Sequence, residues 1–134
     1  MKQPKVLIAD DDAMLLVAVT ERLEHQGMEV VPCRDAYMAT DLARRHRPDV
    51  IILDMNMPAG RGDSTHERLT QMEETRSIPV IYLTGESSAK VQERARSLGA
   101  FAVVLKPFDP AELIAYVRAA AERGRENDSE HRAA

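Results

Sequence analysis

The chain has 134 residues, a length that suits a single domain with one hydrophobic core. Apolar residues make up 44% and charged residues 30%, which is the balance of a globular protein and not of a disordered one. The net charge is −4, Trp is absent, and there are only two Phe and three Tyr, so direct nucleic-acid binding is not expected.

No segment is typical of a membrane span or a secretory signal. The longest purely apolar run, Ala13–Val19, is too short to cross a bilayer. The polar start Met1–Lys5 leads into a short apolar stretch that stops at three aspartates, unlike a signal peptide. A cytoplasmic protein is therefore expected. The lone Cys33 cannot form an internal disulfide and is predicted to be a small buried or half-buried side chain.

The first half of the chain alternates short apolar runs with segments of helical spacing. Gly27, Pro32 and Pro48 close three of these segments, and the wholly apolar run Val50–Leu53 predicts a strand buried on both faces. The other elements predicted here are a strand at Val6–Ala9, a helix at Ala13–His25, a strand at Val30–Val31 and a helix at Ala36–His46.

The second half continues the same alternation. Met57–Gly62 is predicted to be a loop, and Asp109 is predicted to cap a last helix that Gly124 ends. The other elements are a helix from Asp63 or Ser64 to Thr75, a strand at Pro79–Leu83, a helix from Ser87 or Ser88 to Gly99, a strand at Phe101–Leu105 and a helix from Pro110.

Five strand–helix units in succession predict an α/β fold, a doubly wound five-stranded parallel sheet with five helices on its two faces. Its crossovers are expected to be right-handed. Residues 1–123 form the predicted domain, and residues 124–134 are predicted to be a polar, disordered tail.

Polar side chains follow four of the five predicted strands. Asp10 and Asp11 follow the first strand, Asp54 the third, Thr84 the fourth and Lys106 the fifth. Because ligands bind outside the carboxyl ends of parallel strands, these side chains are expected to form one site.

The predicted chemistry at this site is metal-assisted phosphoryl transfer. Two carboxylates 4 Å apart repel by about 1 kcal/mol in water and by about 4 kcal/mol at an effective dielectric constant of 20. Mg²⁺, which prefers carboxylate, water and phosphate oxygens, relieves that repulsion. Asp54 is then the candidate nucleophile, Lys106 supplies an ammonium group and Thr84 a hydroxyl donor. Asp12 is predicted to be a helix cap. The histidines have no ligand spacing and are expected at the surface: His25, His46, His66 and His131.

With these residues in place, the chain resembles bacterial response-regulator receiver domains, including the stand-alone chemotaxis regulator, from about Lys5 to Arg123. The segments that carry the resemblance are Val6–Asp12, Ile51–Pro58, Leu83–Gly85 and Leu105–Phe108. It implies a flavodoxin-like fold with strand order 2-1-3-4-5. It also implies phosphorylation of Asp54 by a sensor histidine kinase or a histidine phosphotransfer protein.

The resemblance further implies the roles of the site residues. Mg²⁺ (or Mn²⁺) is held by Asp10, Asp11, Asp54 and the backbone carbonyl of Asn56. Thr84 and Lys106 bind the phosphoryl oxygens, and the Lys106–Pro107 bond is expected to be cis.

Asn56 and Glu86 are similar to the residues that flank the attacking water in chemotaxis-type regulators, which implies a fairly short-lived phosphoprotein. Val103 occupies the switch position where the family usually has an aromatic residue. Phe101-Ala102 replaces the usual acidic pair, so a monomer or weak dimer is expected. Phe101 either joins an apolar patch or packs against a helix. The resemblance places an unknown downstream protein on the face of the fourth helix, fifth strand and fifth helix.

Two alternatives stay open beside a phosphorylation-controlled switch that is not an enzyme in the usual sense. One is a phosphorylation-independent interaction module. The other is a phosphohydrolase with an Asp nucleophile. Such enzymes typically have a second Asp two residues after the nucleophile, where this chain has Asn56.

Overall fold

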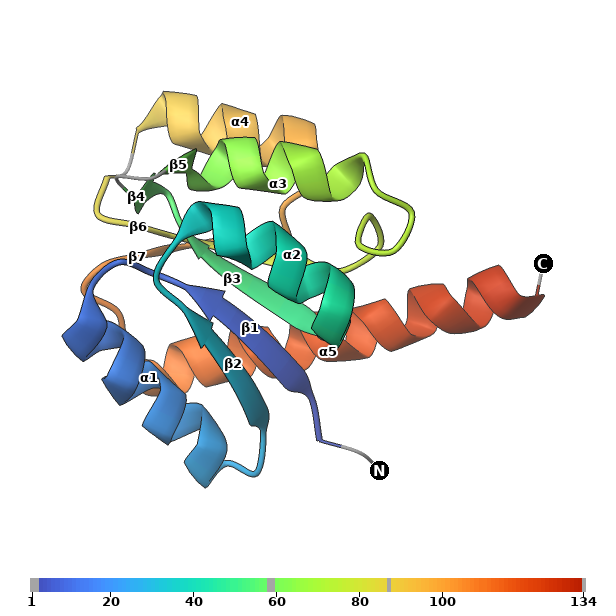
Figure 1. The fold of residues 1–134 in the computed structure, drawn as a ribbon, viewed down its shortest axis with the longest axis horizontal. Helices are drawn as coiled ribbons and strands as arrows, with labels where there is room; N and C mark the ends of the chain where they lie inside the picture. Colours follow the sequence, from blue (N-terminus) through green and yellow to red (C-terminus); the bar gives the residue numbers. More distant parts are fainter. Residues whose placement is uncertain (1–2, 58–59, 87, 134) are drawn as a thin grey trace.

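The structure, a computed structural model, describes residues 3–57, 60–86 and 88–133. Five parallel strands form one sheet, and helices cover both of its faces (Figure 1). The strands of this sheet are β1 (Lys5–Ala9), β2 (Glu29–Cys33), β3 (Val50–Asp54), β6 (Val80–Thr84) and β7 (Ala102–Leu105). The helices are α1 (Ala13–His25), α2 (Ala36–His46), α3 (Gly62–Thr70), α4 (Ala89–Leu98) and α5 (Pro110–Ala133).

The strand order β2-β1-β3-β6-β7 confirms the predicted fold. Counted within the sheet it is 2-1-3-4-5, because β4 (Asn56–Met57) and β5 (Gly60–Arg61) form a separate antiparallel pair. The order reverses between β1 and β3, so the loops after these two strands lie side by side.

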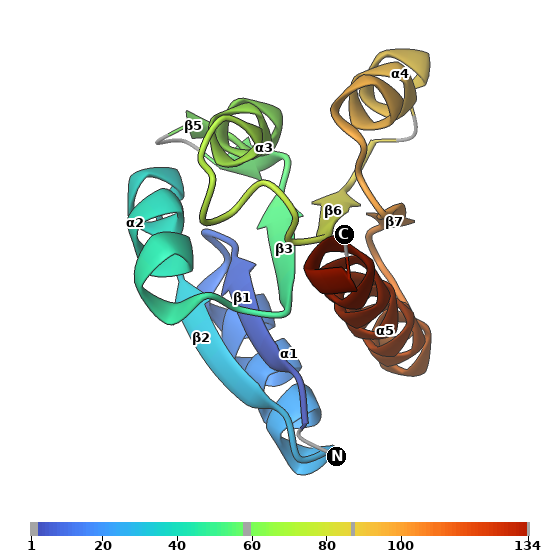
Figure 2. The same cartoon turned by 90° about the vertical axis from the view of Figure 1, so that its right-hand side faces the viewer.

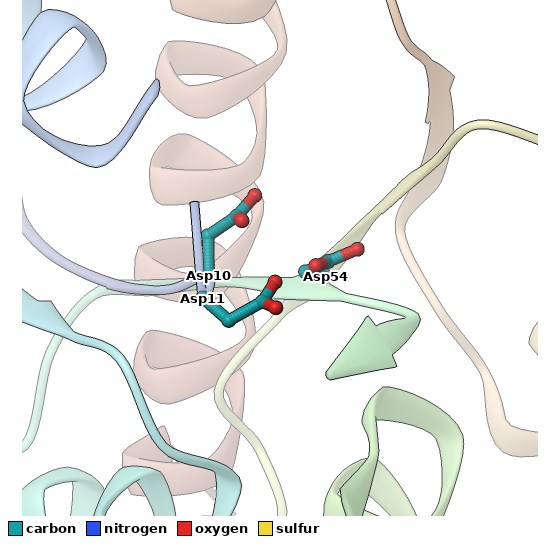
Figure 3. A group of neighbouring side chains, drawn as sticks. All are labelled: Asp10, Asp11 and Asp54. Atoms are coloured by element: carbon teal, nitrogen blue, oxygen red, sulfur yellow. The ribbon is translucent and has the colours of Figure 1, made fainter. Parts of the chain in front are cut away.

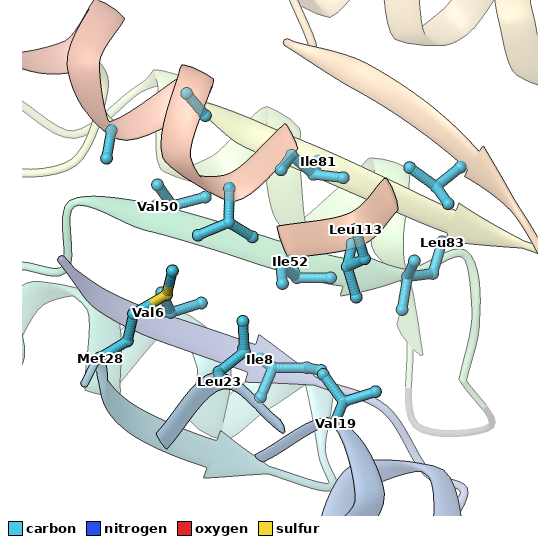
Figure 4. Close-up of a cluster of buried hydrophobic side chains, with 14 of the residues drawn as sticks. Val6, Ile8, Val19, Leu23, Met28, Val50, Ile52, Ile81, Leu83 and Leu113 are labelled. Atoms are coloured by element: carbon cyan, nitrogen blue, oxygen red, sulfur yellow. The ribbon is translucent and has the colours of Figure 1, made fainter. Parts of the chain in front are cut away.

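Two buried clusters hold the layers together. One lies between the sheet and the pair α1 and α5, where Val6, Ile8 and Ile52 meet Leu23 and Leu113 (Figure 4). The other lies on the opposite face and contains Leu7, Ile51, Leu53 and Tyr82. Figure 2 shows α2, α3 and α4 on this second face. β3 is buried throughout, as its unbroken apolar sequence predicts.

Local signals set most of the helix ends. The Asp12 carboxylate caps α1 by accepting the N–H groups of Met14 and Leu15. The Ser88 hydroxyl caps α4, and Gly99 ends that helix with a φ of 77°. These caps are as predicted, while the alternative cap Ser87 lies outside the described residues.

Three predicted boundaries are wrong. β2 continues through Pro32, which is tolerated because β2 is an edge strand. The predicted loop contains the β4–β5 pair, with Pro58 outside the described residues. α3 begins at Gly62 and ends at Thr70, so Asp63 lies in its first turn and Ser64 within the helix, and neither caps it.

α5 continues past Gly124 to Ala133, so the predicted end of this helix is wrong. A glycine ends a helix by adopting a positive φ, and Gly124 does not adopt one. A Cβ there would lie 3.4 Å from the Pro79 side chain, so the glycine lets α5 pass close to the start of β6. The domain boundary at residue 123 stays a prediction.

Candidate functional site

Three carboxylates meet at the carboxyl end of the sheet. Asp10 and Asp11 follow β1, Asp54 ends β3, and the pairing of Ala9 with Leu53 brings the two strand ends together (Figure 3). One ligand atom from each carboxylate lies within 4.8 Å of the other two. An all-oxygen donor set with this spacing fits a hard divalent cation such as Mg²⁺.

Lys106 reaches this group from the end of β7. Its Nζ donates a hydrogen bond of 2.9 Å to Oδ2 of Asp10 and lies 3.5 Å from Oδ1 of Asp54. Burial alone would lower the pKa of Lys106, but the hydrogen bond to Asp10 and the two negative charges raise it instead. Lys106 is therefore a permanently charged group at the centre of the site. The Lys106–Pro107 peptide bond is cis.

Asp54 is 4% exposed, and its pKa is raised from the ordinary carboxyl value. Burial is the main cause, and the charge of Asp10 and a hydrogen bond with Asp11 add to it. The backbone N–H of Asn56, 3.3 Å from Oδ1, and the charge of Lys106 act in the opposite direction. The three carboxylates of the site therefore carry more negative charge than the Lys106 ammonium group balances.

Thr84 ends β6, the strand that pairs with β3, and is fully buried. Its hydroxyl donates to the backbone carbonyl of Glu86 at 3.3 Å and accepts the backbone N–H of the same residue at 3.1 Å. The exposed residues Asn56 and Glu86 line a cleft of about 760 Å³ between α3 and α4. The backbone N–H of Asn56 bonds to Asp54, and the backbone of Glu86 bonds to the Thr84 hydroxyl.

A buried polar pair that the sequence did not predict lies next to this cleft. His66 of α3 is 4% exposed, so its predicted place at the surface is wrong. Its Nδ1 lies 2.7 Å from the hydroxyl of Tyr82 on β6. The signal was available, because His66 is three residues before the buried Leu69 and so shares its helix face. His25 and His46 are exposed as predicted, and the His131 side chain is outside the described part of the chain.

Two arginines, one on α4 and one on α5, have intrachain contacts. Arg94 pairs with Glu67 at 2.7 Å, and Arg118 donates to the side chain of Gln26 at 3.3 Å. Phe101 packs against the core cluster beneath α5, which is the second of its two predicted roles. Cys33 is buried, as predicted.

Gly62 is a close-packed position behind the site, and its substitution is a first prediction. A Cβ there would lie 2.5 Å from the backbone oxygen of Asp54, so the backbone must move. Gly62→Ala should therefore lower the free energy of unfolding by about 1–3 kcal/mol in urea titrations, although alanine normally favours a helix. The matched control is Gly85→Ala, where a Cβ meets no heavy atom within 4 Å. Equal stability of the two variants would contradict the prediction.

A doubly wound parallel sheet with three carboxylates and a lysine at its carboxyl end places the chain among the flavodoxin-like α/β proteins, and comparison with known proteins gives the family. The family model described as the response regulator receiver domain matches residues 6–118. The chain therefore belongs to the response regulator receiver domain family of two-component systems.

Individual relatives agree with this assignment. The chain is 36% identical over 123 residues to the transcriptional regulatory protein PdtaR of Mycobacterium tuberculosis, covering 91% of this chain and 58% of PdtaR. It is 32% identical over 119 residues to the phosphate regulon transcriptional regulatory protein PhoB of Escherichia coli, covering 89% and 52%. The chain thus spans about half the length of the curated relatives it matches.

Solved structures are similar over nearly their whole length. The chemotaxis protein CheY4 of Vibrio cholerae superposes with a TM-score of 0.84 at 30% identity, covering 88% of this chain and 98% of CheY4. The receiver domain of the Francisella response regulator 1452 gives a TM-score of 0.83 at 30% identity, covering 90% and 98%. Among the described residues, no helix is long and apolar enough to cross a membrane.

Proposed function

We propose that Asp54 accepts a phosphoryl group from a histidine-phosphorylated partner and that the modified chain acts as a switch for another protein in the cytoplasm. One observation carries this proposal. Three carboxylates lie within 4.8 Å of one another, and the Lys106 ammonium contacts two of them. Such a group supplies a nucleophile and positive charge for phosphoryl oxygens in the same place.

The proposed transfer is a displacement at phosphorus. A carboxylate oxygen of Asp54 attacks the phosphorus, a P–O bond forms, and the P–N bond breaks with its electron pair going to the leaving imidazole. Lys106 and the Thr84 hydroxyl stabilise the phosphoryl oxygens as negative charge develops on them. A divalent cation held by Asp10, Asp11, Asp54 and the Asn56 carbonyl supplies, when bound, further positive charge.

The decisive test uses a small phosphodonor such as acetyl phosphate with Mg²⁺, followed by intact-mass analysis. The expected result is one added phosphoryl group that hydroxylamine removes, as for an acyl phosphate. Sustained turnover of phosphomonoesters would support the phosphohydrolase instead, and no modification would support the phosphorylation-independent module. Asn56 argues against the phosphohydrolase, because an amide cannot act as acid and base.

The lifetime of the phosphoryl group provides a second prediction. Asn56 and Glu86 are polar, exposed residues of one cleft, and they directly follow the phosphoacceptor strand and the strand of Thr84, respectively. Asn56→Met with Glu86→Leu should slow autodephosphorylation by about tenfold or more, because polar groups that orient the water are replaced by apolar ones. The loss of phosphoprotein is followed by mass after donor removal. Glu93→Leu, on the same cleft, is the control, and an unchanged rate in the double variant would refute the proposed role.

Two surfaces are proposed for partners. An apolar groove of about 170 Å³ between α1 and α5 includes Leu15, Phe108 and Ile114, close to the loops of Asp11 and Lys106, and it suits the phosphodonor.

The downstream protein is assigned to α4, β7 and α5, where Leu105 and Tyr116 are exposed. PdtaR and PhoB are transcriptional regulators by name, and a longer chain with an output domain is the corresponding proposal here. A monomer or weak dimer is proposed because Arg94 and Arg118 have intrachain partners.

A further inference from the structure

The most unusual group outside the phosphoacceptor site is the buried pair of His66 and Tyr82. The two side chains are 4% and 0% exposed, with Nδ1 and the hydroxyl oxygen 2.7 Å apart and the rings edge to face at 5.4 Å. Burial lowers the pKa of His66 to about 4, with the charge of Arg94 adding to the effect. The imidazole is therefore neutral at pH 7, and the pair is a single hydrogen-bonded unit that joins α3 to β6.

This unit is linked to the phosphoacceptor site through both of its elements. Tyr82 lies two residues before Thr84 on β6, so the two side chains point to the same face of the sheet. α3 follows Asp54 through the short β4–β5 pair, and its first residue, Gly62, bonds to the Met55 carbonyl at 3.4 Å. A displacement of the end of β3 therefore acts on His66, and a displacement of the end of β6 acts on Tyr82.

The next element, α4, is loosely attached. Ala95 is its only fully buried residue, and the described contacts that fix it include the ion pairs of Arg94 with Asp63 at 3.5 Å and Glu67 at 2.7 Å on α3. Tyr82 lines the cleft of about 760 Å³ that separates α3 from α4. α4 therefore borders this cleft and is attached by the Arg94 ion pairs to the helix that carries His66.

Thr84 is the residue whose hydrogen bonds change first when Asp54 is phosphorylated. In the structure its hydroxyl is engaged by the backbone of Glu86, in the loop that leads to α4. Binding a phosphoryl oxygen requires the hydroxyl to give up its bond to the Glu86 carbonyl, since it has one proton to donate. That exchange disturbs both the end of β6 and the start of the loop to α4.

We infer that Tyr82, hydrogen-bonded to His66, is the positioning residue through which phosphorylation of Asp54 changes the arrangement of α3 and α4. This inference rests on the proposed function, because without a phosphoryl group there is no state to carry. The neighbouring Val103, paired in register with Tyr82 on β7, has no polar atom and no ring with which to do this. The large buried side chain under α4 is on β6 and not on β7.

The test measures the phosphorylation of Asp54 and the response of α4 separately. Tyr82→Phe keeps the ring and removes only the hydrogen bond, and Tyr116→Phe on α5 is the matched control. Phosphorylation is measured by intact mass with acetyl phosphate and Mg²⁺. The response of α4 is measured as the change in amide hydrogen exchange over residues 89–98 on adding beryllofluoride and Mg²⁺.

We expect Tyr82→Phe to be phosphorylated within about twofold of the wild-type rate. The change in amide hydrogen exchange over residues 89–98 on adding beryllofluoride and Mg²⁺ should be about two- to thirtyfold smaller than in the wild type. Tyr116→Phe should respond like the wild type. A full α4 response in Tyr82→Phe would overturn the inference and leave the proposed function standing. If that variant unfolds, His66→Leu, which removes the other partner, is subject to the same criterion. A wild-type chain that takes up no phosphoryl group would overturn both.

Discussion

We expect Asp54→Asn to abolish phosphoryl incorporation from acetyl phosphate and, in metal-free buffer at neutral pH, to raise the free energy of unfolding. The first effect follows because an amide is not a nucleophile toward phosphorus under these conditions. The second follows because the Asp54 pKa is raised in the folded chain, so folding disfavours its ionised form. Lys106 keeps its 2.9 Å hydrogen bond to Asp10 in this variant, so no buried cation loses its main partner.

The pH dependence has a definite sign. A carboxyl group whose folded pKa lies above its unfolded value of 3.8 adds stability below 3.8 and loses it as pH rises through the folded pKa. The stability difference between Asp54→Asn and the wild type should therefore grow with pH over that window and level off above it. Urea titrations at several pH values with chelator present measure it. Asp109→Asn, which removes a charge from an exposed helix cap, is the control. Phosphorylation of Asp54→Asn, or a lower stability than the wild type, would contradict the prediction.

The sheet and the placement of its polar groups could be predicted because both depend on local signals. The unbroken apolar run of β3 indicates a strand buried on both faces, and caps such as Asp12 and Ser88 mark the helix starts. The doubly wound topology then brings the ends of β1 and β3 together without further information. Asp10, Asp11 and Asp54 are neighbours for that reason alone.

The features that could not be predicted depend on contacts between distant segments. Nothing near Gly124 in sequence indicates that α5 passes Pro79 at that point, so the glycine looked like a helix end. Periodicity places His66 on the helix face of Leu69, but its hydrogen-bond partner, Tyr82, is sixteen residues away on another element. The hydrogen bond that satisfies the buried imidazole depends on tertiary structure, so the pair itself could not be predicted.

The second large expected effect is the stabilisation of the fold by Mg²⁺ bound at the group of three carboxylates. Mg²⁺ should raise the free energy of unfolding of the wild-type chain by about 2.7 kcal/mol at a concentration one hundred times its dissociation constant. Asp10→Asn should remove most of this stabilisation, because it deletes a fully buried carboxylate from the group of three. Loss of even an outer-shell partner costs about 10- to 100-fold in metal affinity, and loss of a direct ligand should cost at least as much.

Asp12→Asn is the matched control, because it removes the same charge two residues away. Asp12 caps α1 through its side-chain oxygen, a role that Asn fills equally well, so this variant should fold normally and keep its response to Mg²⁺. Urea unfolding of all three chains with and without Mg²⁺ measures the effect. If Asp10→Asn gained as much stability from Mg²⁺ as Asp12→Asn, the cation would be bound elsewhere. Loss of the Mg²⁺ response in Asp10→Asn alone would instead identify the buried carboxylate beside Lys106 as the ligand, and would require the cation and the Lys106 ammonium to share Asp10.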